Sequence, residues 1–327
     1  MTCVSSTLLA SETAAYIRTE ATSGSILFGA VDTAKYSGDL ISVNVYPDEQ
    51  GGRVTSFTVA FTSLSATSSS GTDQLTPSNY ASPAILDSGT TITLLPNDIA
   101  STVFEELGAE VSERLGAVVV PCALAQNTGT LNYQFGSVGG PTIKVAMSQI
   151  VLPLVLANGE VPTYPNGEAA CQLGIEAAGD LPVLFGDTFL RSAYVVYDLD
   201  NNRIALAQTD FNATGSNVVA FPSQGAAIPS ATSAANEAQV TQTATGIPKE
   251  GNTVTATGAG ASATYNPDAT GLSAASGFAA TSTSTSSSSS KKSVGGEGPR
   301  PFQYSTVIVG LISMLGMGMG GGIFAFL

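Results

Sequence analysis

The sequence predicts a mainly β domain with one or two short helices, followed by a disordered stalk and an apolar C-terminal helix. Between residues 14 and 220, short alternating or apolar runs, such as 41–45 and 55–61, are broken by Gly, Pro, Asn and Ser. This spacing favours strands. The composition then shifts to Ala, Ser, Thr and Gly, and the end of the chain is apolar. We therefore divide the chain into an unassigned N-terminus (1–13), a globular domain (14–220), a stalk (221–303) and a tail (304–327).

The composition excludes several classes of function. The 327 residues include no histidine, which excludes Ser-His-Asp and Cys-His catalysis and any zinc site that needs histidine. Eleven basic residues against 25 acidic ones give a formal charge of -14. An acidic chain repels phosphate backbones, so we expect no nucleic-acid partner. A surface with few charges suits a secreted protein that works at low pH.

Within the domain, one segment has the pattern of a helix. Pro96-Asn97-Asp98 is a start signal, and the apolar residues that follow have helical spacing over residues 97–114. These apolar residues are Ile99, Val103, Phe104, Leu107 and Val111. The polar, Ser/Thr-rich residues 65–80 and the segment 158–168 are expected to be surface loops.

An acidic residue stands at the end of a predicted buried strand. Residues 84–95 read Ala-Ile-Leu-Asp-Ser-Gly-Thr-Thr-Ile-Thr-Leu-Leu, so Asp87 lies between two apolar runs. Burying a carboxylate is costly unless hydrogen bonds hold it. The hydroxyls of Ser88, Thr90 and Thr91 and the N–H of Gly89 could supply them. The same pattern, taken alone, also fits an aspartate that caps a turn.

This stretch resembles the second active-site motif of the pepsin-like (A1 family) aspartic proteases. Further blocks are similar to the C-terminal lobe of that family, in the same order along the chain, and the fungal yapsin and candidapepsin type is the most similar. They are residues 24–32, 35–40, 183–191 and 194–198. The resemblance covers roughly residues 14–212 and implies that the domain is the C-terminal lobe of the bilobal pepsin-like fold.

The resemblance implies a role for each residue of the motif. Asp87 would be a catalytic carboxylate, and Ser88 would support the contact between the two active-site loops. Gly89, Thr90 and Thr91 would bind substrate. The Leu184-Phe185-Gly186 strand would pass behind the loop and support it. The chemistry expected is acid hydrolysis of polypeptides by two carboxyl groups that activate a water, with no metal and no cofactor.

Only one such motif occurs in the chain. Asp32-Thr33-Ala34 lacks the glycine, and Asp187-Thr188-Phe189 belongs to the supporting block, so we expect structural roles for both aspartates. Because one carboxylate cannot perform the reaction, the chain is expected to be a fragment. It would lack the N-terminal lobe and the first catalytic aspartate, and it would be inactive alone. Its partners would be that lobe and polypeptide substrates.

The cysteines also follow the resemblance. A pair at the places of Cys122 and Cys171 forms a disulfide in the C-terminal lobe of the family, and the alternative is two buried thiols. Cys3 is left over and is either free or paired outside the chain.

The C-terminal part indicates export to the cell surface. Asn212-Ala213-Thr214 is a sequon for N-glycosylation, and residues 281–290 are all Ser or Thr, which fits an O-glycosylated stalk. The small residues Ser293, Gly295 and Gly296 precede a polar spacer and an apolar tail, the pattern of a GPI-attachment signal. A transmembrane helix is the alternative, although no basic residue follows the tail. Residues 1–13 do not resemble a signal peptide, although an exported protein needs one. We therefore expect a fragment of a secreted protein that is anchored to the plasma membrane or the cell wall.

Three other functions remain open at this stage. The chain could be a non-catalytic pepsin-like binding module or inhibitor. It could be a structural protein of the cell wall, in which the stalk and anchor are the function. It could also form a homodimer in which each subunit supplies one aspartate, as in retroviral proteases.

Overall fold

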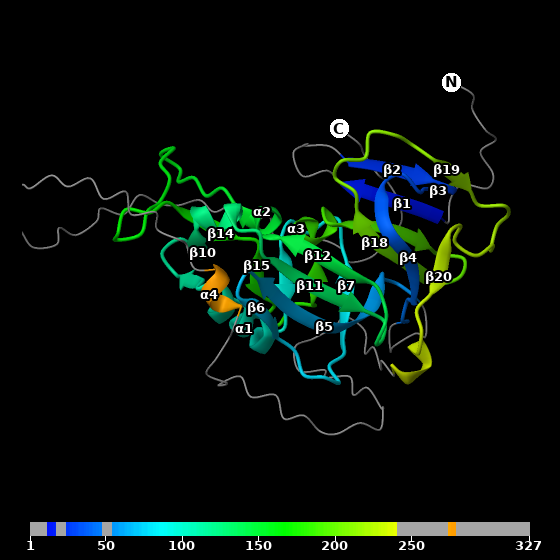
Figure 1. The fold of residues 1–327 in the computed structure, drawn as a ribbon, viewed down its shortest axis with the longest axis horizontal. Coiled ribbons are helices and arrows are strands. Elements are labelled where there is room, and N and C mark those ends of the chain that lie inside the picture. The colour runs from blue at the N-terminus through cyan, green and yellow to red at the C-terminus, as the bar shows by residue number, and fades with distance from the viewer. Residues whose placement is uncertain (1–11, 18–23, 48–53, 241–273, 279–327) are drawn as a thin grey trace, which may run out of the picture.

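The computed structural model describes residues 12–17, 24–47, 54–240 and 274–278, which form a lobe built mainly from strands (Figure 1). The expected mainly β class with short helices is confirmed. Residues 1–13 lie almost wholly outside the described residues, as do Cys3, Ser293, Gly295, Gly296, most of the stalk and the entire tail.

The largest sheet carries the motif residues. It has eight strands in the order β12-β11-β5-β7-β16-β8-β15, and β6 pairs with β5. These strands are β5 (Thr58–Ser68), β6 (Gly71–Gln74), β7 (Ser82–Leu86), β8 (Thr93–Leu95), β11 (Thr130–Phe135), β12 (Thr142–Ala146), β15 (Ile175–Ala177) and β16 (Leu184–Phe185).

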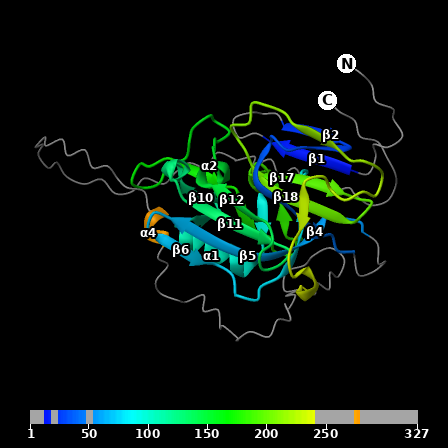
Figure 2. The same ribbon diagram turned by 45° about the vertical axis from the view of Figure 1, so that its right-hand side comes forward.

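A second sheet has six strands in the order β2-β1-β17-β18-β4-β20. Its members are β1 (Glu12–Ile17), β2 (Gly24–Phe28), β4 (Tyr36–Asn44), β17 (Ala193–Asp198), β18 (Arg203–Thr209) and β20 (Ala231–Ser233). A two-stranded sheet lies beside it and joins β3 (Ala30–Asp32) to β19 (Val218–Ala220). Figure 2 shows this group of strands at one end of the lobe.

A four-stranded sheet, β13-β14-β10-β9, lies at the opposite end of the lobe. It consists of β9 (Glu110–Ser112), β10 (Ala117–Pro121), β13 (Val151–Leu152) and β14 (Ala170–Leu173). The helices are α1 (Asn97–Leu107), α2 (Met147–Ile150), α3 (Asp187–Leu190) and α4 (Ala275–Phe278), with 3₁₀ turns η1 (Cys122–Gln126) and η2 (Glu237–Gln239).

A cluster of aromatic rings forms the centre of the core. Phe185 on β16 makes edge contacts with the rings of Phe61, Tyr133, Phe135 and Phe189, at centroid distances of 4.8–5.5 Å. All five rings are buried. Such pairs stabilise beyond the apolar area they bury. The cluster therefore holds β16 and the following helix α3 in a fixed place beneath the motif residues.

Two local predictions were wrong. Helix α1 ends at Leu107 rather than at residue 114, because Gly108 adopts a left-handed conformation (φ 63°) and caps the helix. Val111 is 69 % exposed and lies on β9 instead. Residues 65–80 form no simple surface loop: β5 and β6 make a hairpin there, because Leu64, Ala66 and Leu75 alternate into the core. The expected loop at residues 158–168 is confirmed as a series of exposed turns.

The expected start of the stalk at residue 221 is too early. Strand β20 pairs with β4, and Ile228 is buried against Val31 and Leu40. Glu237 forms an ion pair with Arg203, with 2.8 Å between the Glu237 Oε2 and the Arg203 Nη2. Composition alone did not reveal this segment, because its few apolar residues are buried by strands that lie far away in the sequence.

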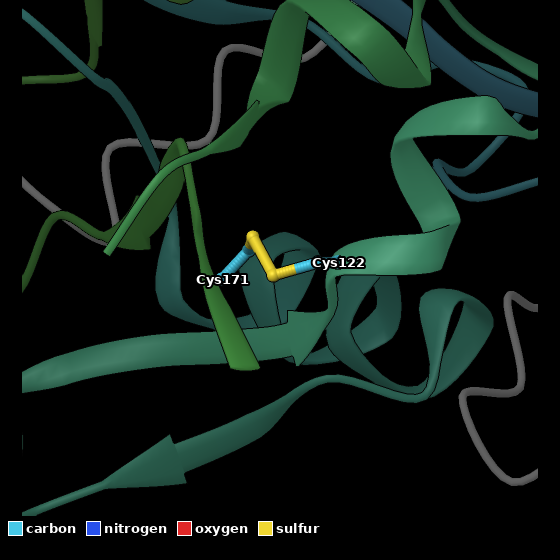
Figure 3. Close-up of a disulfide and its surroundings, with 2 residues drawn as sticks. All are labelled: Cys122 and Cys171. Carbon is cyan, nitrogen blue, oxygen red and sulfur yellow. A yellow bond between two sulfur atoms is a disulfide. The ribbon is translucent and has the colours of Figure 1, made fainter. Parts of the chain in front are cut away.

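The expected disulfide between Cys122 and Cys171 is confirmed (Figure 3). It joins the first residue of η1 to strand β14 across 49 residues of sequence. Closing a loop of this length reduces the entropy of the unfolded chain and stabilises by about 4 kcal/mol in the chain-entropy model.

Replacing both bridge cysteines by alanine is therefore expected to lower the free energy of unfolding by about 4 kcal/mol. Urea unfolding of the oxidised wild type and of the double variant measures this difference. Cys3→Ala, which leaves the bridge intact, is the control. Equal midpoints for wild type and double variant would contradict the expectation.

Helix α1 carries a buried acid. Glu106 is 1 % exposed, and its two carboxyl oxygens have no hydrogen-bond partner among the described residues. Burial, and to a smaller extent the nearby Asp73 carboxylate, raises the pKa of Glu106 from 4.5 to about 7. The Glu106 side chain is therefore neutral in acid.

The raised pKa predicts how stability depends on pH. The contribution of Glu106 is fully present below about 4.5 and is lost as pH rises towards about 7, where the buried group must ionise. We expect Glu106→Gln to remove about 3 kcal/mol of the stability change between pH 4.5 and pH 7.5. Urea unfolding at pH 4.5 and pH 7.5 tests this. The exposed neighbour Glu105→Gln is the matched control, and parallel pH profiles for both variants would refute the assignment.

Candidate active site

The motif residues form a loop that is held by a strand from a distant part of the chain. Residues 87–92 connect β7 to β8, and β16 lies between these two strands, parallel to β7 and antiparallel to β8. Beyond the end of β16, two backbone N–H groups donate to carbonyl oxygens of the loop. The N–H of Asp187 donates to Thr90 at 2.8 Å, and the N–H of Thr188 donates to Thr91 at 3.1 Å. The loop is therefore fixed by the backbone of residues 184–188.

Asp87 lies at the start of this loop, partly buried. Its backbone N–H donates to the carbonyl of Phe185 at 3.1 Å. Its Oδ1 accepts the N–H of Gly89 at 2.9 Å, and its Oδ2 accepts the hydroxyl of Thr90 at 2.7 Å. Each carboxyl oxygen therefore has a donor from the loop itself, which orients the carboxylate.

The other motif residues surround Asp87 at the surface. Ser88, Gly89 and Thr91 are exposed, and Thr90 is partly exposed. Leu184, Phe185 and Gly186 lie behind the loop, as the sequence predicts. The structure thus brings these eight residues together, with an aspartate accessible on one side and a buried strand on the other.

Gly186 leaves no room for a side chain. A Cβ placed on it would lie 2.3 Å from the carbonyl oxygen of Thr90 and 2.4 Å from that of Ile92. Its φ of -86° is available to any residue, so the requirement for glycine comes from space alone. The loop passes directly over the Gly186 backbone.

The buried hydroxyls of Thr93 and Thr188 support the loop from the core side. The sequence predicted no role for either residue. Thr188 is fully buried and its hydroxyl donates to the carbonyl of Gly174 at 2.8 Å. Its oxygen is 3.0 Å from the hydroxyl of Thr93, which then acts as the donor. The signal that could have revealed Thr188 is a polar residue inside an otherwise apolar block, next to Gly186.

Two ionisable groups lie near Asp87. Burial, and secondarily the charge of Asp87, raises the pKa of Tyr197, whose ring packs on Phe57 at 4.4 Å. Burial raises the pKa of Asp187 as well, with the Arg191 charge opposing and the Asp87 charge adding to the effect. Asp187 is the first residue of α3, where its backbone holds the loop.

Asp32 belongs to a separate structural turn. Its Oδ1 accepts the backbone N–H groups of Asn217 at 2.7 Å and Ala34 at 3.1 Å, and its Oδ2 accepts the Ser216 hydroxyl at 2.7 Å. Burial would raise the pKa of Asp32, but these hydrogen bonds outweigh it and lower the pKa. Because its oxygens are occupied in joining β3 to β19, Asp32 is not a partner for Asp87.

Among the described residues, no group of three or more Cys, Asp and Glu side chains is placed to hold a metal ion. Within the same ranges, no helix has both the length and the apolar character that crossing a bilayer requires.

An Asp-Ser-Gly-Thr loop with a hydrophobic-hydrophobic-Gly strand behind it is the arrangement that the resemblance to the pepsin-like aspartic proteases implies. Residues 4–209 match the family described as eukaryotic aspartyl protease. The chain belongs to this family.

Curated relatives agree with this assignment. The chain is 40 % identical over 217 residues to a probable aspartic-type endopeptidase, opsB, of Aspergillus oryzae, covering 66 % of this chain and 42 % of that protein. It is 33 % identical to aspartic proteinase 3 of Saccharomyces cerevisiae, covering 72 % and 38 %. It is 35 % identical to secreted aspartic protease 9 of Candida albicans, covering 60 % and 34 %. The chain thus spans less than half the length of these relatives.

Among solved structures, the aspartic proteinase from Irpex lacteus is similar with a TM-score of 0.47 and 24 % identity. The match covers 63 % of this chain and 58 % of that one.

Proposed function

We propose that this chain supplies one half of the active site of an aspartic-type endopeptidase, with Asp87 as its catalytic carboxylate. The observation that carries the proposal is the environment of Asp87. Both carboxyl oxygens are oriented by loop donors, Gly89 and Thr90, and the loop lies at the surface. Family membership and the relatives named as endopeptidases support the same conclusion.

The proposed chemistry needs a second carboxyl group. When two carboxyl groups share one proton, the ionised one removes a proton from a bound water, and that water attacks the scissile carbonyl carbon. The protonated one donates its proton to the carbonyl oxygen. Collapse of the resulting tetrahedral species breaks the C–N bond after the nitrogen receives a proton. Such a pair titrates as a unit, so neither group has a pKa of its own.

The second carboxyl group is proposed to come from another lobe. The chain contains one Asp-Ser-Gly-Thr motif, and Asp32 is occupied in a structural turn. The relatives are more than twice as long as the part that matches this chain. We therefore propose that the active enzyme contains a further lobe with its own aspartate, and that the present chain alone is inactive.

The residues around Asp87 receive roles from their positions. Gly89 and Thr91, which are exposed, are proposed to contact the substrate backbone, and Thr90 to orient Asp87 while lining the cleft. Ser88 is proposed to support the contact with the other lobe. Leu184, Phe185 and Gly186 keep the loop in place from behind.

We also propose that the mature protein is located at the cell surface. The disulfide fits an oxidising compartment, and one relative is named a secreted protease. Asn212 is exposed, as an N-glycosylation site requires. The GPI-attachment candidates Ser293, Gly295 and Gly296 lie outside the described residues, and their role is a proposal from the sequence.

The proposed function is tested by comparing two proteins in a peptide-hydrolysis assay at acidic pH. One is this chain, and the other is a two-lobed protein in which the N-terminal lobe of a relative precedes it. We expect pepstatin-sensitive cleavage from the second protein only. An active two-fold dimer of this chain, seen by gel filtration, would overturn the need for another lobe. A correctly folded but inactive two-lobed protein would favour a non-catalytic binding module.

A further inference from the structure

A short segment from the C-terminal part of the chain is seated on the lobe. Residues 274–278, which include α4, pack against α1 and β5, although the preceding described residue is Val240. Figures 1 and 2 both show α4, in orange, beside β6 and α1. The sequence predicted a disordered stalk here, since the surroundings are rich in Ser, Thr, Ala and Gly.

The backbone of this segment is held by three side chains of the lobe. The N–H of Ala274 donates to the carboxylate of Asp73 on β6 at 2.7 Å, and the hydroxyl of Ser68 on β5 donates to the Ala274 carbonyl at 2.7 Å. The amide of Asn127 donates to the Gly277 carbonyl at 2.7 Å. These contacts fix the path of the segment without depending on its side chains.

Side chains then select the sequence of the segment. Ala274 is fully buried and Phe278 is 3 % exposed, and both join the main hydrophobic core of the lobe. A Cβ on Gly277 would lie 2.1 Å from the Ser68 hydroxyl oxygen. On the lobe, a Cβ on Gly129 would lie 2.3 Å from the Phe278 ring, so Gly129 provides the space that the ring fills.

We propose that β5, β6, α1 and residues 127–129 form a docking site for a peptide of the pattern Ala-x-x-Gly-Phe, occupied in the same molecule by residues 274–278. The segment acts as a strap. It ties residues 274–278 to the lobe beside α1.

The occupant of the docking site is this chain rather than another protein. Residues 274 and 277 of the same chain make all three hydrogen bonds, and Phe278, the only large apolar side chain of the segment, is buried. The stretch of chain between residues 240 and 274 closes at a modest entropic cost. A strap in the same molecule also binds at a high effective concentration.

Hydrogen exchange on the full chain tests the proposal. We expect Phe278→Ala to speed exchange of the Ala274 and Gly277 amides at least about tenfold, because the ring that anchors them is lost. Amides in the β17–β18 pair, which lie in another sheet, should be unaffected. Phe302→Ala, the same substitution further along the chain, is the matched control. Equal rates of amide exchange in wild type and Phe278→Ala would overturn the proposal. Wild-type protection that depends on protein concentration would also overturn it, because the segment would then dock on a second molecule.

A peptide in solution tests the specificity. A synthetic peptide with the sequence of residues 272–280 should bind the full-length Phe278→Ala protein and restore slow exchange of the Gly129 amide, which donates to Asn127 Oδ1. The same peptide with valine in place of glycine at position 277 should bind at least about tenfold more weakly, since its side chain meets Ser68. Equal binding of the two peptides, or binding of neither, would refute a docking site of this pattern.

Discussion

Replacing Asp87 with asparagine in a two-lobed enzyme is expected to reduce peptide hydrolysis at acidic pH by at least about a thousandfold, with the fold intact. An amide can neither take a proton from water nor share one with a second carboxyl group, and general acid and base catalysis contributes about 10²- to 10⁴-fold. The loop should persist, because the asparagine oxygen still accepts the Gly89 N–H and the Thr90 hydroxyl can accept from the amide.

The matched control is Asp39→Asn, which makes the same chemical change on an exposed part of β4. Activity at acidic pH and urea unfolding are measured on all three proteins. We expect the Asp39 variant to match the wild type in both. Full activity of the Asp87 variant would show that this aspartate is a turn residue and not a catalytic one.

Gly186→Ala is expected to destabilise the lobe strongly. The new Cβ would meet two backbone carbonyls, which unlike a flexible side chain cannot move aside. Either β16 withdraws from between β7 and β8 or the loop that carries Asp87 is displaced. We expect a loss of about 3 kcal/mol or more in the free energy of unfolding, at the upper end of overpacking effects.

Gly215→Ala provides the comparison for this variant. No atom lies within 4 Å of a Cβ at position 215, and its φ carries no restriction to glycine. Its stability should stay within about 0.5 kcal/mol of the wild type. Unfolding in urea distinguishes the two substitutions, and a Gly186 variant as stable as the Gly215 variant would show that the loop is not held as tightly as the contacts imply.

The loop that carries Asp87 could be predicted from sequence because its residues are local and chemically distinctive. A single run of residues, 84–95, contains the acid, the glycine and the hydroxyls, and Leu184 to Gly186 follow in a second recognisable block. The structure brings both blocks together. The disulfide was predicted from the resemblance and not from spacing, since two cysteines 49 residues apart could equally be buried thiols.

What the sequence could not indicate depends on long-range packing. The Ser/Thr-rich residues of β5 and β6 have the composition of a loop. The strand becomes evident only in the folded lobe, where the alternating residues Leu64 and Ala66 are buried in the core. Residues 274–278 contain one large apolar side chain, too little to signal order in a segment of low complexity. Its order comes from the pocket at Gly129 and from Asp73, which lie about 150 and 200 residues earlier in the chain.

The insertion of β16 between β7 and β8 has a consequence for how the protein reaches its native state. Leu184 pairs with Ile85, so the strands that hold the loop of residues 87–92 are separated by about 100 positions in the sequence. Such contacts form slowly, because the intervening chain must first become ordered. The loop that carries Asp87 should therefore reach its final position late in folding, after residues 184–186 have entered between β7 and β8.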